Sequence, residues 1–172
     1  MAFNYKKLNY KLFFELTKTN KKQLLNIIND TENLKFMGTK WTNEKIEELI
    51  KYSKIDYENN YKDTEYLYIC ILYNKKVIGL VYSHPSIYMR NKYIQSGAFI
   101  DKKYQNKGIT KYALNYHYNI FKKYFKKNLI GIVNIDNTPT IRFCNKHFKN
   151  IENNFTFKNN KYNVYLHEYI NI

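Results

Sequence analysis

The chain has little of the residues that build disulfide frameworks, linkers or membrane spans. Its 172 residues include two cysteines, two prolines and five glycines, and no apolar run approaches the roughly 18 residues of a membrane span. Cys70 and Cys144 are too few for a disulfide-dependent domain. The N-terminus lacks a clean apolar stretch and a small-residue cleavage site, unlike a signal peptide. We therefore expect one cytoplasmic domain over residues 1–172, without membrane contact.

Arginine is scarce although the chain is strongly basic. The net charge is +15, yet only two of the 29 basic residues are arginines, Arg90 and Arg142. Proteins that read nucleic acids usually rely on the bidentate fork of arginine, so nucleic-acid binding is not the expected function. The excess of Lys, Asn, Ile and Tyr is typical of an AT-rich genome, and we take this bias as the main source of the charge. The positive field would still favour an anionic cofactor.

Hydrophobic periodicity predicts strands and helices in a definite order. A first strand is expected at Leu12–Thr17, and β-rich runs predict a hairpin around Asn74-Lys75. An N-cap at Thr42 or Asn43 begins the second helix. The pattern favours an α+β domain with a central mixed, mostly antiparallel sheet flanked by helices. The expected helices are 21–30, 41–54, one from 109 and a short one within 137–148; the other strands are 65–73, 76–83, 93–100, 129–135, 154–157 and 162–169.

The helix from Ile109 is amphipathic, with one apolar stripe. The segment before it, QNKGIT (residues 105–110), lies where a strand passes into this helix. A helix start leaves about four backbone N–H groups unpaired, and these can hold a phosphate. Gly108 removes a Cβ from the approach, and Thr110 adds a hydroxyl donor. The stripe consists of Ile109, Tyr112, Ala113, Tyr116, Ile120 and Tyr124.

Two better-known phosphate motifs are absent from this turn. Neither G-x-x-x-x-G-K-[ST] nor G-x-G-x-x-G occurs. Four lysines nevertheless surround the turn, so a plain turn and an anion site both stay open on these residues alone. The lysines are Lys102, Lys103, Lys107 and Lys111.

Four segments together resemble the GNAT superfamily of acyl-CoA-dependent N-acetyltransferases. GAFIDKKYQNKG resembles the lead-in to its Gln/Arg-x-x-Gly-x-Gly/Ala motif, and IVNIDNTPTIRFC resembles the strand and N-x-x-[ST]-I-R segment that follow. The hairpin TEYLYICILYNKKVIGLVY resembles its second and third strands. NDTENLKFMGTKWTNEKIEELI is similar to a branch that includes ribosomal-protein alanine and amino-sugar acetyltransferases. The resemblance spans roughly residues 12–169.

The resemblance implies acetyl-CoA as co-substrate and no metal. In the family, backbone amides of the glycine turn bind the pyrophosphate, the preceding strand pairs with the pantetheine, and an Asn contacts the pantetheine arm. Here these roles fall on Phe99 and Ile100 of the strand, on Asn137, and on Gln105, Asn106, Lys107, Gly108, Ile109 and Thr110 of the turn. The acceptor amine would approach between the first two helices and the closing hairpin.

Two positions depart from the family pattern. Gln95 stands where many relatives have a Glu, so the base would be water or another residue. Cys144 stands where many have a Tyr that protonates the departing sulfur. Cys144 is either this acid or an inert buried thiol. Nominal bases are His84, His117 and Asp136, and alternative acids are Tyr165 and Tyr169.

The acceptor is expected to be a primary amine of a small molecule, either a polyamine or an amino sugar. Trp41 is either an acceptor-site residue or a hydrophobic anchor for the second helix. The alternatives are a protein N-terminal or lysine acetyltransferase, and a CoA-binding module without turnover. A homodimer is possible. Seven acidic residues form either a rim for a cationic amine or a solvated helix face: Glu44, Glu47, Glu48, Asp56, Glu58, Asp63 and Glu65.

Overall fold

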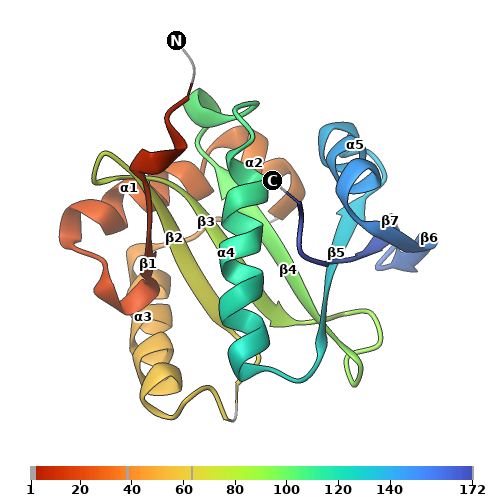
Figure 1. The fold of residues 1–172 in the computed structure, drawn as a ribbon, viewed down its shortest axis with the longest axis horizontal. Helices are drawn as coiled ribbons and strands as arrows, with labels where there is room; N and C mark the ends of the chain where they lie inside the picture. The colour runs from red at the N-terminus through yellow and green to blue at the C-terminus, as the bar shows by residue number, and fades with distance from the viewer. Residues whose placement is uncertain (1–2, 38, 63, 172) are drawn as a thin grey trace.

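The computed structural model describes residues 3–37, 39–62 and 64–171 as one seven-stranded sheet with helices on both faces (Figure 1). The strand order is β1-β2-β3-β4-β5-β7-β6, and within these residues only β4 and β5 pair in parallel. This confirms the predicted α+β fold with a mixed, mostly antiparallel sheet. The strands are β1 (Leu8–Leu12), β2 (Leu67–Tyr73), β3 (Lys76–Pro85), β4 (Tyr93–Ile100), β5 (Asn128–Asn134), β6 (Lys149–Phe157) and β7 (Asn160–Leu166).

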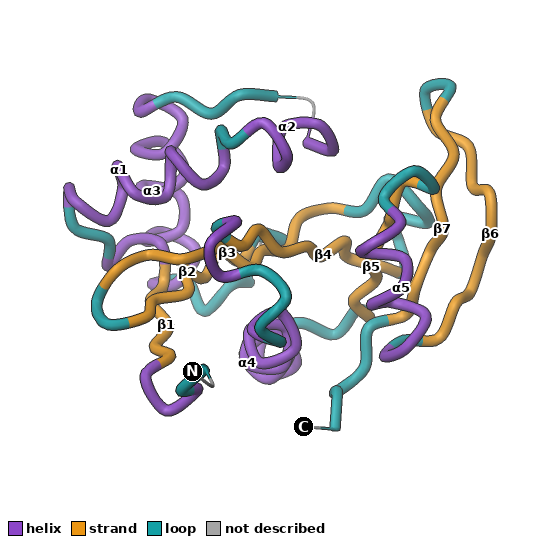
Figure 2. Tube along the Cα trace, turned by 90° about the horizontal axis from the view of Figure 1, so that it is seen from above, coloured by secondary structure: helices purple, strands orange, loops and turns teal. Residues whose placement is uncertain are grey.

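The helices divide between the two faces of the sheet (Figure 2). One face carries α4, which packs Ala113 and Phe121 against Ile69 of β2 and its neighbours. The other carries α1–α3, with Leu24 and Ile46 in a second core. The helices are α1 (Lys18–Ile28), α2 (Thr31–Met37), α3 (Asn43–Glu58), α4 (Ile109–Tyr124) and α5 (Thr138–His147).

The sheet opens between β4 and β5. These strands pair only at Tyr93–Gln95 with Asn128–Ile130, whereas β4 continues beside β3 as far as Ile100. Figure 1 shows β4 and β5 moving apart beyond the paired section. The last part of β4 therefore has one edge without a neighbouring strand. α4 begins just after this edge, which brings the glycine turn to the open end.

Several predicted elements differ in detail. The first strand at Leu12–Thr17 is wrong: β1 ends at Leu12, and Phe13–Glu15 form a 3-10 turn. Phe13 and Leu16 are both buried, a spacing of three that suits a turn and not a strand. α2 was not predicted, because its seven residues carry too few apolar positions to show a period. The last strand ends at Leu166 instead of Tyr169.

The amphipathic stripe of α4 is also rotated from the prediction. Tyr116 is 39% exposed, while His117 is fully buried. The buried line instead follows Ile109, Ala113, His117 and Phe121 at a spacing of four. Tyr116 lies beside this line and stacks on Tyr10 of β1 at 4.0 Å. Tyrosine suits such a border position because its ring is apolar and its hydroxyl stays wet.

Candidate active site

The start of α4 is left uncapped. Gly108 is the N-cap residue, in the left-handed conformation at φ 69°, and no described side chain caps the helix. In contrast, Thr17, Thr42 and Asn137 cap α1, α3 and α5 by accepting a backbone N–H. A positive φ is inexpensive only for glycine among the common residues. The first N–H groups of α4 are thus available to an anion at the positive end of the helix dipole.

Side chains of the turn brace its own backbone. Gln105 Nε2 donates to the carbonyl of Ile100 at 3.0 Å, and Lys107 Nζ donates to the carbonyl of Lys103 at 2.8 Å. Asn106 has a positive φ of 57°, which asparagine tolerates better than most residues. Ile109 is buried in the core, so its N–H is the group it can offer a ligand. The turn is therefore held in shape by its own residues.

Tyr5 is a residue of this region that the sequence did not reveal. Its hydroxyl donates to the carbonyl of Lys107 at 2.7 Å, and its ring stacks on Tyr112 of α4 at 4.3 Å. A shallow depression of about 770 Å³ adjoins this contact. The depression is lined by Phe3, Tyr5, Tyr73, Lys103, Tyr104, Asn106, Lys107 and Gly108. Aromatic and basic side chains therefore border the turn.

The open edge of β4 presents specific peptide groups. The N–H of Asp101 donates to Ile78 of β3 at 2.8 Å. Because peptide groups alternate in direction along a strand, those of Phe99 also face β3, while those of Ala98 and Ile100 face the opening. Ile100 was predicted to lie on this edge, and Ala98 was missed because the register decides it. Phe99 instead directs its ring to the α1–α3 face, 5.3 Å from Tyr82.

Asn137 lies across the opening from β4. It follows the end of β5, its N–H donates to Asn134 at 2.9 Å, and its Oδ1 accepts from the N–H of Thr140 at 3.3 Å. Its first role is thus the N-cap of α5. The Nδ2 group has no hydrogen-bond partner among the described residues and is the donor that Asn137 can offer a ligand.

An aromatic surface covers β2, β3 and β4 on the α1–α3 face. Tyr82 is its centre: it stacks on Tyr68 at 6.4 Å and on His84 at 5.7 Å. Its hydroxyl lies 2.6 Å from where a Cβ of Gly97 would be, so only glycine admits the ring there. Burial raises the pKa of Tyr82 to about 12. The phenol is therefore neutral at physiological pH.

His84 and Gln95 are cross-strand partners on this same surface. His84 Nδ1 lies 2.8 Å from the carbonyl of Pro85. The Oε1 atom of Gln95 is buried and has no hydrogen-bond partner among the described residues. Burial lowers the pKa of His84, an effect that the bond to Pro85 partly offsets. The other nominal bases lie elsewhere: His117 is on the buried side of α4, and Asp136 is exposed in the turn before α5.

The candidate acids do not meet at this surface. Cys144 is 3% exposed and belongs to the core under α4, and burial raises its pKa to about 12. The hydroxyl of Tyr165 donates to Asn145 at 2.8 Å, and Tyr169 is 54% exposed near the C-terminus. These observations favour the inert reading of Cys144.

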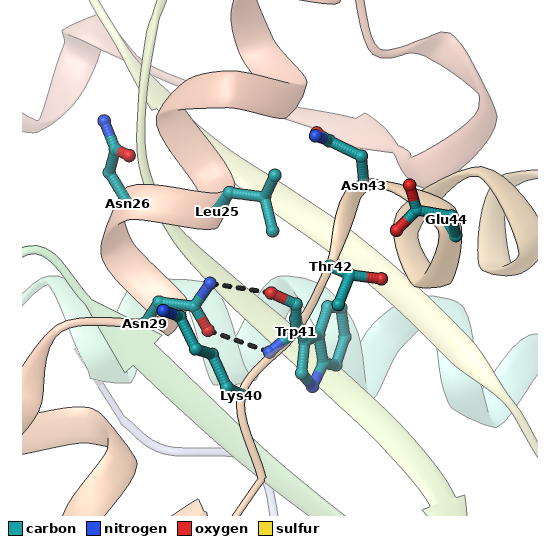
Figure 3. A pocket seen from close by; sticks show the side chains of 8 residues that line it. All are labelled: Leu25, Asn26, Asn29, Lys40, Trp41, Thr42, Asn43 and Glu44. Carbon is teal, nitrogen blue, oxygen red and sulfur yellow. Dashed lines mark hydrogen bonds between the residues drawn. The ribbon is translucent and has the colours of Figure 1, made fainter.

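Trp41 is held by a pair of amide hydrogen bonds (Figure 3). Asn29 Nδ2 donates to the carbonyl of Trp41, and the N–H of Trp41 donates to Asn29 Oδ1, both at 2.8 Å. The indole packs edge-on against Phe13 and Tyr68. Trp41 is thus an anchor for the segment before α3, and it also lines a pocket of about 490 Å³. The pocket lining is Leu25, Asn26, Asn29, Lys40, Trp41, Thr42, Asn43 and Glu44.

The acidic residues mostly form ion pairs with lysines. Glu47 pairs with Lys21 at 2.7 Å, and Glu48 with Lys45 at 2.9 Å. Of the others, Glu58 pairs with Lys54 and Glu65 with Lys127; Asp63 lies outside the described residues. This arrangement favours the solvated helix face over a rim for a cationic amine.

Within the described residues, no helix has the length and apolar character to cross a membrane.

Comparison with known proteins gives this geometry a context. The sequence profile of the Acetyltransferase (GNAT) family matches residues 28–148. No curated protein matches the chain. The fold is similar to that of a spermidine N-acetyltransferase from Vibrio cholerae in complex with CoA and spermine, with a TM-score of 0.65, 15% identity and 94% of each chain covered.

Two further solved structures have the same fold. A ribosomal-protein-S5-alanine acetyltransferase from Vibrio fischeri is similar with a TM-score of 0.68 and 14% identity, covering 96% of this chain and 93% of that one. The N-acetyltransferase PseH from Campylobacter jejuni, in complex with acetyl coenzyme A, is similar with a TM-score of 0.59 and 15% identity. The coverage there is 94% of this chain and 98% of that one. At these identities the likeness establishes the fold.

Proposed function

Because the chain belongs to the GNAT acetyltransferase family, we propose that it transfers the acetyl group of acetyl-CoA to the primary amine of a small molecule. The observation that carries the proposal is the uncapped start of α4 at Gly108 beside the open edge of β4. An anion site and an unpaired strand edge lie next to each other there. The two suit a cofactor with a diphosphate at one end and an amide-containing arm at the other.

We propose that the diphosphate lies on the N–H groups that begin α4. Gly108, Ile109 and Thr110 would supply the amides, and Lys107 would add positive charge. Gln105 and Asn106 would keep the turn in its present shape. The pantetheine arm would pair with β4 through the peptide groups of Ala98 and the N–H of Ile100, whose carbonyl accepts from Gln105. Asn137 would donate from the opposite side. The peptide groups of Phe99 face β3, so Phe99 would not pair with the arm. Its side chain would instead form part of the aromatic surface on the α1–α3 face.

The surroundings support an amino sugar more than a polyamine as acceptor. A polyamine needs several carboxylates, but most acidic side chains near α3 are already paired with lysines. The α1–α3 face, where the acceptor would bind, instead carries aromatic rings, among them Tyr68, Tyr82 and the half-buried Trp41. The pocket beside Trp41 adds amide groups from Asn26 and Asn43. Ring faces suit the apolar side of a sugar, and amides suit its hydroxyls.

A turnover screen tests the proposal. Thiol release from acetyl-CoA is measured with amino sugars, nucleotide-linked amino sugars, polyamines, aminoglycosides and peptides with free N-termini or lysines. The expected result is the highest kcat/KM with an amino sugar. A preference for peptides would establish a protein acetyltransferase instead. Tight CoA binding by calorimetry with no thiol release across the whole panel would overturn the enzymatic proposal and favour the module without turnover.

A further inference from the structure

We infer that His84 accepts the proton of the attacking amine, taking the place of the carboxylate that Gln95 does not supply. This inference rests on the proposed function and adds a catalytic residue to it. A glutamine amide has no usable basicity, so Gln95 cannot remove a proton itself. His84 is its direct cross-strand neighbour in the β3–β4 register. Side chains of such a pair lie about 5 Å apart on one face of the sheet.

The hydrogen bond of His84 fixes which ring nitrogen can act as a base. Nδ1 lies 2.8 Å from the carbonyl oxygen of Pro85. A carbonyl only accepts, so Nδ1 carries the hydrogen in this contact. In the neutral ring Nε2 then holds the lone pair. The stacking of the ring on Tyr82, at an interplanar angle of 7°, limits its rotation. The lone pair is therefore on Nε2, and the stacked ring holds it in one orientation.

His84 lies level with the point where the opening between β4 and β5 closes. Pairing of β4 with β5 ends at Gln95, which is also the residue opposite His84 on β3. A pantetheine arm that enters along Ala98 and Ile100 can advance no farther than this point, so its thioester would lie beside it. Gln95, Gly97 and Tyr82 lie on the same face of the sheet as His84. An amine on the aromatic surface would thus meet the thioester next to His84.

The surroundings keep His84 neutral. Burial lowers its pKa, so at pH 7 the ring is in the form that accepts a proton. The phenol of Tyr82 stacks on its ring and the amide of Gln95 is its cross-strand partner, and neither is charged at that pH. No charged side chain of the described residues contributes to the lowered pKa. The buried Gln95 Oε1, which has no partner, is an acceptor that can hold the amine N–H.

The proposed step transfers the acetyl group directly from the thioester to the neutral amine. The amine nitrogen attacks the carbonyl carbon of the thioester, a C–N bond forms, and the C–S bond breaks. A proton leaves the nitrogen for Nε2 of His84. CoA departs as a thiolate that takes up a proton from solvent, and His84 returns its proton to solvent after the amide product leaves.

Two substitutions test the assignment. His84→Asn keeps a donor near the Nδ1 position for Pro85 but has no basic atom, whereas His84→Ala opens a space for added imidazole. We expect His84→Asn to lower kcat/KM by at least about 100-fold and to leave the Kd for CoA within 2-fold. Wild-type kcat/KM should fall as the pH drops through a midpoint below 6.5, and this limb should vanish in His84→Asn. Imidazole should restore part of the activity of His84→Ala.

The outcomes separate this inference from the function on which it rests. If the wild type turns over an amine and His84→Asn keeps kcat/KM within 3-fold with the same pH profile, His84 is not the base and the acetyltransferase proposal stands. If the wild type acetylates nothing, both proposals fall. ¹⁵N spectra of the histidine ring give a readout without turnover: a proton on Nε2 of neutral His84, with none on Nδ1, would also overturn the inference.

Discussion

The hydroxyl of Tyr5 donates a hydrogen bond of 2.7 Å to the carbonyl oxygen of Lys107, 102 positions along the chain. The contact ties the N-terminal segment to the turn before α4. The ring of Tyr5 is held in place independently of this hydrogen bond, because it stacks on Tyr112 and packs edge-on against Phe3. The Lys107 carbonyl belongs to the peptide whose N–H is that of Gly108. Tyr5 therefore orients the first amide of the proposed diphosphate site.

Tyr5→Phe should weaken cofactor binding without unfolding the protein. The ring keeps its stacking on Tyr112, and only the hydrogen bond to Lys107 is lost. Such a bond contributes about 0.5–1.5 kcal/mol, so the Kd for acetyl-CoA should rise by about 2- to 12-fold. Isothermal titration measures the Kd, with Tyr52→Phe on the exposed side of α3 as the matched control. An unchanged Kd for Tyr5→Phe would show that the turn keeps its shape without this bond.

Gly108→Glu should abolish binding of acetyl-CoA. The carboxylate would occupy the phosphate position and bring a negative charge to it, and we expect a loss of more than about 100-fold. Gly108→Ala is the milder companion: a left-handed conformation costs a residue with a Cβ about 1–2 kcal/mol, and this Cβ would lie 3.2 Å from the Tyr5 hydroxyl. Its affinity should fall about 10-fold. A folded Gly108→Glu variant with wild-type affinity would place the diphosphate elsewhere.

Local signals predicted most of the fold, and tertiary register decided the rest. The hairpin was predictable because two β-rich runs flank a short polar turn. In the structure Asn74 and Lys75 both adopt the positive φ that a tight two-residue turn demands. The first strand was misplaced because Phe13 and Leu16 are apolar in a 3-10 turn as they would be in a strand. The position of Gly108 followed from the sequence. The sites of Tyr5 and of Ala98 did not, since each depends on which distant segment lies beside it.

The role of Cys144 can be separated by one substitution. Because the thiol lies in the core and burial raises its pKa to about 12, we expect Cys144→Ala to keep kcat within 3-fold. The free energy of unfolding should fall by about 1–2 kcal/mol, the cost of a small core cavity. Steady-state kinetics and urea denaturation measure the two quantities. A 100-fold loss of kcat at unchanged stability would instead identify Cys144 as the acid that protonates the departing sulfur.

Two buried histidines should make the protein sensitive to acid. Burial lowers the pKa of His117 to about 3, with His167 as a second cause, and burial lowers that of His167 to about 3. The unfolded chain, in which a histidine has a pKa of about 6.5, binds more protons over this range. The stability that each neutral histidine contributes is therefore fully present above pH 6.5 and is lost as the pH falls toward 3. For each histidine, the free energy of unfolding should decrease by about 2 kcal/mol between pH 7.5 and 5.

His117→Met isolates the contribution of one of these histidines. Both ring nitrogens of His117 lack a partner among the described residues, so an apolar side chain of similar volume should not lower stability at pH 7.5. The decrease in the free energy of unfolding between pH 7.5 and 5 should become smaller by about 2 kcal/mol. Urea denaturation at several pH values measures it, with His147→Gln on α5 as control. The same decrease in His117→Met as in the wild type would contradict the assignment.

Trp41→Ala should separate an acceptor contact from an anchor. The indole packs against Phe13 and Tyr68 and also lines the pocket beside Asn29, so truncation should cost about 2–4 kcal/mol of stability. If the amine binds there, KM for the acceptor should also rise at least 10-fold while the Kd for CoA stays within 2-fold. Phe14→Ala is the matched control, because Phe14 is a half-buried aromatic that packs on Tyr57 instead of this pocket. Equal KM values for the acceptor in both variants would show that Trp41 has only a structural role. Destabilisation alone should not raise KM for the acceptor while leaving the Kd for CoA unchanged.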